Sequence, residues 1–186
     1  LAHCLEAYCS PGYHPMADGI ALVGIKLVKE NLLEAYNNGT NVTARTNMLS
    51  AALMGATAFQ KGLGAMHALS HPVGAIYNTH HGLTNAVFMP YVLERNKSAI
   101  EDRITKAAKY LELKNTNYKG FMDWILNLRK ELEIPHTLKE LINDDSRLEE
   151  MSTMALKDPS TGGNPIALNQ KDFLELYQNA YKGKLS

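Results

Sequence analysis

The sequence contains few cysteines and no excess of charge of either sign. Its 186 residues include only Cys4 and Cys9. Their spacing fits neither a disulfide framework nor a zinc finger, so we predict two reduced, structural thiols. Lys and Arg together number 19, as do Asp and Glu, so the formal net charge is zero. This balance gives no basic surface for nucleic acid or anionic lipid, and we expect neither partner.

The sequence also lacks long apolar runs and runs in which apolar and polar residues alternate. The longest nearly charge-free run, 48–64, includes Lys61 and polar residues, whereas a membrane span needs about 20 apolar residues. No basic start precedes an apolar stretch, so no secretory signal is predicted and the cytoplasm is the expected compartment. β-Branched residues do not alternate with polar ones over more than a few positions, so no sheet is expected. The first residues resemble the interior of a helix without a cap, and we therefore expect the chain to be a fragment.

The remaining patterns are helical. We predict helices over 15–36, 42–61, 65–77, 82–94, 100–113, 118–133 and 172–181. In the first helix, an approximate helical stripe consists of Ile20, Val23, Leu27, Leu32 and Tyr36. The second helix carries small residues that allow close helix approach, and we expect it to be central. We also expect Pro90 to bend the fourth helix, since proline removes a backbone donor. Together these patterns predict one all-α domain, a helical bundle spanning 1–186.

A cluster of histidines is the feature most suggestive of chemistry. The segment 67–82, HALSHPVGAIYNTHHG, carries His67, His71, His80 and His81 in a mostly apolar setting. His67 and His71 are four apart and share one helix face, so both could point to one metal ion. His3, on another apolar helix, could complete the set. The alternative is a group of core histidines that satisfy their hydrogen bonds with carbonyl groups.

Other motifs are weaker. Gly62-Leu63-Gly64 lacks the third glycine and the preceding strand of a dinucleotide fingerprint, so we interpret it as a helix stop. The segment 158–165, DPSTGGNP, either covers a pocket or is a mobile surface connection. His14 and His136 lie beside prolines and are expected to be solvated.

Three sequence blocks carry a family resemblance. The run GLGAMHALSHPVGAIYNTHHGLTNAVFMPYVLERN, with LAHCLEAYCSP at the start and GNP near the end, resembles the iron-containing, group III alcohol dehydrogenases and their glycerol dehydrogenase relatives. The resemblance implies the dehydroquinate synthase-like, two-domain architecture of that family. In it, an N-terminal α/β domain binds NAD or NADP, and a C-terminal helical domain holds a divalent metal in the cleft. This chain resembles the second domain alone, and the nucleotide-binding domain is absent from it.

The resemblance assigns roles to individual histidines. It implies that His3, His67 and His81 are metal ligands, for Fe²⁺ or also for Zn²⁺, which imidazole suits well. It implies that His71 is not a ligand but lies near the nicotinamide, where it positions the cofactor or relays a proton. This overrules the interpretation of His67 and His71 as a ligand pair. His80 is taken as incidental, and a fourth ligand, an aspartate, is expected four residues before His3, outside this chain.

The implied function is that of a metal-dependent alcohol dehydrogenase. The whole enzyme would interconvert a small alcohol and an aldehyde or ketone by hydride transfer with NAD or NADP, and we expect it to be a homo-oligomer. The isolated chain is expected to be inactive. Two alternatives stay open. One is a non-redox helical module that holds a structural metal. The other is a glycerol dehydrogenase or dehydroquinate synthase-like relative that performs different chemistry at a related site.

Overall fold

The computed structural model describes residues 1–185, which form helices and turns and no β-strand. This confirms the predicted all-α fold. The α-helices are α1 (Ala2–Cys9), α2 (Pro15–Asn37), α3 (Val42–Ala58), α4 (Ala65–Tyr77), α5 (His81–Tyr110), α6 (Tyr118–Glu131), α7 (Leu148–Lys157) and α8 (Gln170–Lys182). Three short 3₁₀ helices connect them: η1 (Phe59–Lys61), η2 (Leu138–Glu140) and η3 (Pro159–Gly163).

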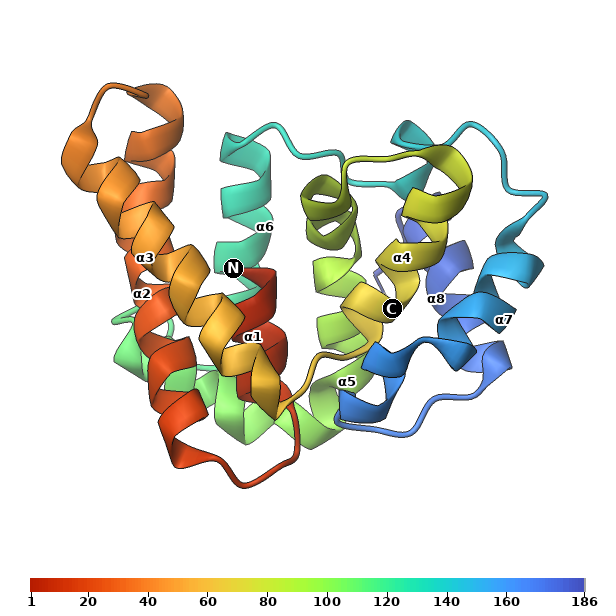
Figure 1. Ribbon diagram of the computed structural model, residues 1–186, viewed down its shortest axis with the longest axis horizontal. Helices are drawn as coiled ribbons and strands as arrows, with labels where there is room; N and C mark the ends of the chain where they lie inside the picture. Colours follow the sequence, from red (N-terminus) through yellow and green to blue (C-terminus); the bar gives the residue numbers. More distant parts are fainter. Residues whose placement is uncertain (186) are drawn as a thin grey trace.

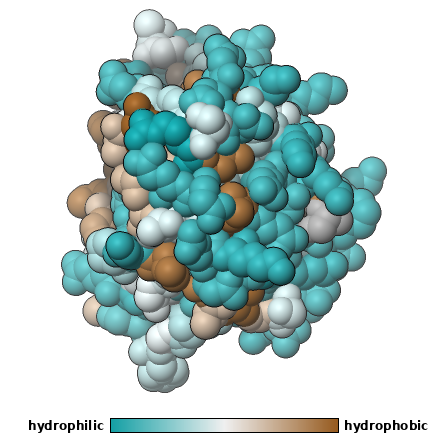
Figure 2. Space-filling view, turned by 90° about the vertical axis from the view of Figure 1, so that its right-hand side faces the viewer, coloured by the Kyte–Doolittle hydropathy of each residue, from teal (hydrophilic) through white to brown (hydrophobic). Residues whose placement is uncertain are grey.

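The helices are arranged around one continuous apolar core. The antiparallel pair α2–α3 lies on one side and the pair α7–α8 on the other, with α1, α4 and α5 between them (Figure 1). The face toward α7 and α8 is mostly hydrophilic, with scattered hydrophobic atoms (Figure 2). None of the helices formed by residues 1–185 combines the length and the apolar character that a bilayer crossing requires. Cys4 and Cys9 are buried, free thiols, as predicted.

Local sequence signals set several helix ends. The helix α2 begins at Pro15, with His14 as N-cap accepting a hydrogen bond from the backbone N–H of Ala17 at 3.2 Å. The helix α4 occupies the predicted residues and ends at Asn78, which adopts a left-handed conformation with φ of 52°. The segment 62–64 is indeed a helix stop, since Gly62 has φ of 144°, which a side chain would strain.

Two predictions of the fold are wrong. The expected separate helices over 82–94 and 100–113 are one helix, α5, because residues 95–99 contain no glycine or proline that would end it; Pro90 lies inside this helix. The helical stripe on α2 is only partly buried, since Val23 is 37% and Tyr36 54% exposed. Instead α2 buries smaller residues, and a Cβ on Gly24 would lie 2.6 Å from the Cys4 sulfur. The close α1–α2 packing explains this choice.

The helix α3 is also not central. It buries only a narrow face of small residues, namely Ala44, Ala51, Gly55 and Ala58. The opposite face carries Leu49 and Leu53, which are 72% and 69% exposed. The helix α7 was not predicted, and it packs against α4 and α8.

Candidate metal centre

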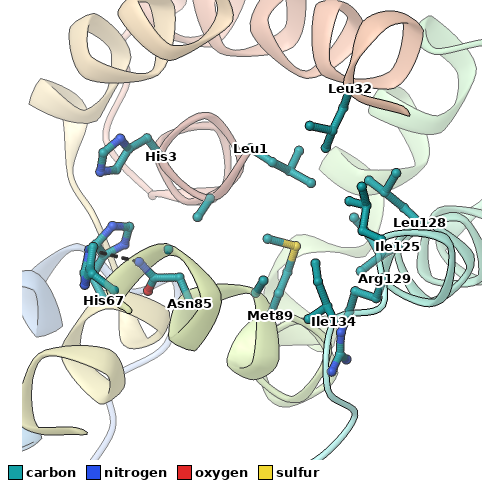
Figure 3. A pocket seen from close by; sticks show the side chains of 15 residues that line it. Leu1, His3, Leu32, His67, Asn85, Met89, Ile125, Leu128, Arg129 and Ile134 are labelled. Carbon is teal, nitrogen blue, oxygen red and sulfur yellow. Dashed lines mark hydrogen bonds between the residues drawn. The ribbon is translucent and has the colours of Figure 1, made fainter. Parts of the chain in front are cut away.

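Four histidines from three helices meet at one place. His3 comes from α1, His67 and His71 from α4, and His81 is the first residue of α5. The ring centroids of His3 and His67 are 4.9 Å apart, those of His67 and His81 5.3 Å, and those of His71 and His81 5.2 Å. The close-up shows His3 and His67 facing each other at one end of a pocket (Figure 3). The structure therefore brings together the residues that the sequence singled out.

The first turn of α4 is held by two side chains remote in sequence. A helix N-terminus leaves backbone N–H groups without intrahelical partners. The Glu6 carboxylate accepts from the N–H of Met66 at 2.7 Å, and the Asn164 carbonyl oxygen accepts from the N–H of Ala65 at 3.1 Å. A Cβ on Gly64 would lie 3.0 and 3.1 Å from these two side-chain oxygens. Glycine at this position thus makes room for both caps, and the helix dipole favours the Glu6 charge.

His67 has the environment of a metal ligand. Its side chain is 2% exposed, and its Nδ1 contacts the second carboxylate oxygen of Glu6. Because an ionised carboxylate only accepts hydrogen bonds, the ring donates from Nδ1, and in its neutral form it keeps the lone pair on Nε2. That Nε2 is buried and has no hydrogen-bond partner among the described residues. A histidine held by a carboxylate through one nitrogen, with the other free, is the usual arrangement in metal sites.

The sequence patterns do not single out Glu6. It is the only acidic residue of α1, and it lies three positions after His3, on the same side of the helix. Its side chain is 6% exposed, although glutamate is rarely buried without a partner. A lone acidic residue in an otherwise apolar helix is the signal that could have revealed it.

For both His3 and His81, burial favours the neutral form that metal binding requires. Burial lowers the pKa of His3 to about 4, and the neighbouring His67 adds to this effect. Burial likewise lowers the pKa of His81, with further contributions from nearby histidines. The His81 ring lies between the Ser70 hydroxyl, 3.4 Å from its Nδ1, and the Asn85 amide, which donates to its Nε2 at 3.0 Å.

The side chains do not adopt a finished coordination geometry. Among residues 1–185, no group of three or more His, Cys, Asp and Glu residues is arranged to hold a metal ion. Asn85 already donates to the Nε2 of His81, so metal binding through that nitrogen requires this hydrogen bond to be exchanged. What the structure does provide is three neighbouring imidazoles, two of them with a lowered pKa, and one buried nitrogen without a partner.

His71 lies at the outer side of the cluster. Its side chain is 43% exposed, and its Nδ1 is 2.8 Å from a carboxylate oxygen of Asp158. Its ring stacks on His81 with an angle of 9° between the planes. His80 is the N-cap of α5, and its Nδ1 accepts a hydrogen bond from the backbone N–H of Leu83. His14 and His136 are exposed, as predicted.

The pocket beside the histidines is mostly apolar. It has a volume of about 270 Å³, with His3, His67, His81 and Asn85 at one end. The remaining wall includes Leu32, Met89, Ile125, Leu128 and Ile134 (Figure 3). The guanidinium of Arg129 turns away from this space and donates to the carbonyl oxygen of Pro135 at 2.6 Å. The pocket thus combines a polar, imidazole-lined end with an apolar body.

Comparison with known proteins agrees with this description. Residues 1–181 match the family model described as Fe-containing alcohol dehydrogenase family, C-terminal. The chain belongs to the iron-containing alcohol dehydrogenase family. This confirms the resemblance that the histidine block indicated.

Individual relatives support the assignment. The chain is 33% identical to the 1,3-propanediol dehydrogenase of Citrobacter freundii, over 97% of its own length and 49% of that protein. It is 32% identical to the NADPH-dependent butanol dehydrogenase of Clostridium saccharobutylicum, over 98% and 49%. The crystal structure of a 1,3-propanediol oxidoreductase superposes with a TM-score of 0.92 at 30% identity, covering 97% of this chain and 49% of that one. The chain therefore spans about half the length of the curated relatives it matches.

Proposed function

We propose that this chain is the metal-binding domain of an enzyme that interconverts a small alcohol and an aldehyde or ketone by hydride transfer with NAD or NADP. The observation that carries the proposal is the environment of His67. Its Nδ1 contacts the buried Glu6 carboxylate, while its buried Nε2 has no partner within residues 1–185 and the ring lies beside His3 and His81. A buried polar atom without a partner is costly, so a bound group that uses its lone pair accounts for it.

The residues present fit a divalent metal. We assign His3, His67 and His81 as its ligands, because all three can be neutral imidazoles and their rings are neighbours. Imidazole suits both Fe²⁺ and Zn²⁺, and the family name favours iron. When bound, the metal supplies Lewis acidity that polarises the oxygen of an alcohol or carbonyl group.

The other residues of the site act on substrate and cofactor. The apolar body of the pocket, with Met89 and Ile134, contacts the carbon chain of the substrate and excludes water. We assign His71 as a catalytic and cofactor-contacting residue, because it is the exposed histidine at the edge of the cluster. Imidazole can exchange a proton near neutral pH, which suits a relay. NAD or NADP would be bound mainly by an N-terminal domain that is not part of residues 1–186.

The family relationship favours this function over the alternatives. The curated relatives named above are alcohol-oxidising dehydrogenases, whereas a module with a structural metal needs no pocket beside the ligands. The description of the matching family model as C-terminal supports the assignment of 1–186 as a C-terminal domain. Homo-oligomerisation and a cytoplasmic location stay predictions.

The test is alcohol-dependent formation of NADH or NADPH by the complete enzyme that contains this chain. We expect His67→Ala to abolish turnover and metal retention together. The matched control is His80→Asn, one residue from His81, because asparagine is also a good helix N-cap and the replaced ring lies outside the ligand set. Turnover that survives His67→Ala would refute the proposal, and so would equal losses in both variants.

A further inference from the structure

The segment 158–165 is fixed to α4 at both of its ends. Asp158 contacts His71, and Asn164 caps the first turn of α4 through the N–H of Ala65. Between them, η3 (Pro159–Gly163) begins with Asp158 as its N-cap. None of its residues lines the pocket beside the histidines, so the segment does not cover that pocket. It is an ordered support for the helix that carries His67 and His71.

Packing within the segment leaves little freedom. A Cβ on Gly163 would lie only 2.0 Å from the carbonyl oxygen of Leu63, so the two backbones are in close contact. The Thr161 hydroxyl donates to the carbonyl oxygen of Ala155 at 2.7 Å. The buried Asn164 side chain exchanges hydrogen bonds with Asn96, each at 2.9 Å. The position of Asp158 is thus set by contacts on either side of it.

Both oxygens of the Asp158 carboxylate are engaged. Oδ1 accepts from the backbone N–H of Ser160 at 2.8 Å, and Oδ2 lies 2.8 Å from the Nδ1 of His71. The carboxylate side chain is only 12% exposed, whereas His71 is 43% exposed. An ionised carboxylate offers no proton, so the hydrogen in this bond belongs to Nδ1 of His71. The neutral ring therefore has its lone pair on Nε2.

We propose that Asp158 is a positioning residue that holds His71 in the Nδ1–H tautomer, with its ring in one orientation over His81. The proposal rests on the role assigned to His71 above, because either relaying a proton or contacting the nicotinamide needs one defined tautomer. A carboxylate that accepts from one ring nitrogen of a histidine fixes the tautomer and the orientation of the ring. Asp158 itself touches neither the pocket nor the three proposed ligands.

The direct test is the tautomer of His71, read from nitrogen chemical shifts of the ¹⁵N-histidine-labelled protein without added metal or cofactor. The signals of His71 are identified as those that are missing from the spectrum of His71→Gln. We expect the Nδ1–H form in the original protein and a populated Nε2–H form in Asp158→Asn, which keeps the N-cap of η3 but loses the charge. The matched control Ser160→Ala retains the carboxylate and the backbone N–H that binds it, so the Nδ1–H form should persist. The proposal would be overturned if His71 were in the Nε2–H form in the original protein, or if its tautomer were the same in Asp158→Asn.

Kinetics of the complete enzyme then separate positioning from a purely structural contact. We expect Asp158→Asn to lower kcat about 100-fold, the low end for a general acid–base group, while KM for the alcohol stays the same. The double variant His71→Ala/Asp158→Asn should be no slower than His71→Ala, because residues that act as a unit are not additive. The positioning role would be refuted if the losses of kcat in the two single variants multiplied in the double variant. A change of the His71 tautomer in Asp158→Asn without a loss of kcat would refute it as well. An enzyme without alcohol turnover would refute the proposed function instead, and the tautomer would still be measurable.

Discussion

Replacing Glu6 by glutamine perturbs the proposed metal centre without touching a ligand. Glu6 is buried and uses one oxygen for the N–H of Met66 and the other for Nδ1 of His67. Glutamine has nearly the same shape but offers one oxygen and one NH₂ group. If the oxygen stays with Met66, the NH₂ group donates to Nδ1, and the imidazole proton moves to Nε2. The nitrogen proposed to bind metal is then blocked.

The Glu6 carboxylate supports a proposed metal ligand and also stabilises the fold, so its loss should lower both metal affinity and unfolding free energy. Loss of a carboxylate partner behind a metal-binding histidine costs about 10- to 100-fold in metal affinity. This corresponds to about 1.4 to 2.8 kcal/mol of binding free energy. The metal-free protein also loses a charge-assisted hydrogen bond, worth about 1.5 to 3 kcal/mol of unfolding free energy. Both affinity and stability should therefore fall.

The assay is a competition titration with Zn²⁺ and a chromophoric chelator, with urea unfolding in parallel. The matched control is Glu30→Gln, since Glu30 is 47% exposed and its Lys26 partner is 3.9 Å away. Such surface pairs contribute little, so affinity and stability should both stay unchanged. Metal affinity that is equal in Glu6→Gln and in the control would refute the role assigned to the carboxylate.

Three further predictions concern stability and activity. Asn164→Ala leaves the N–H of Ala65 and the Asn96 amide without partners, so urea unfolding should show a loss of about 3 kcal/mol, against no change for the exposed Asn143→Ala. The pKa of His3 is about 4 in the folded chain, whereas the unperturbed side chain has a pKa of 6.5. Between these two pH values the unfolded chain therefore binds more protons than the folded chain does. The metal-free protein should thus lose stability as pH falls through this window, less so in His3→Gln. The chain alone, with added metal, should form no NADH from alcohols, and any metal-dependent formation would contradict the domain assignment.

Most of the helical framework could be predicted from local patterns. The sequence predicts α4 at its observed residues, because Gly64 precedes it and Asn78 ends its apolar periodicity. The prediction divides α5 wrongly, because the change in polarity near Asn96 resembles a helix boundary. Asn96 is in fact buried against Asn164, 68 positions away, and this tertiary contact places a polar residue inside the helix. Local polarity does not reveal such a contact.

The candidate site was predictable only in part. The four histidines stand out by type and spacing, and the structure brings them together. The two carboxylates that hold His67 and His71 do not stand out, because Glu6 and Asp158 lie 61 and 87 positions away from them. No periodicity links residues at such distances. The ligand types could thus be predicted from the sequence, whereas their hydrogen-bond partners required the fold.

The most direct test of the metal centre is the metal content of the complete enzyme in four single variants. His3→Ala, His67→Ala, His81→Ala and His71→Ala would each be purified after anaerobic Fe²⁺ loading and analysed for bound metal and turnover. We predict that the first three lose the metal together with activity, because each lacks a ligand, whereas His71→Ala keeps the metal and loses much of its rate. Equal metal loss in all four variants, or full metal content in any of the first three, would contradict the assignment of ligands and helper.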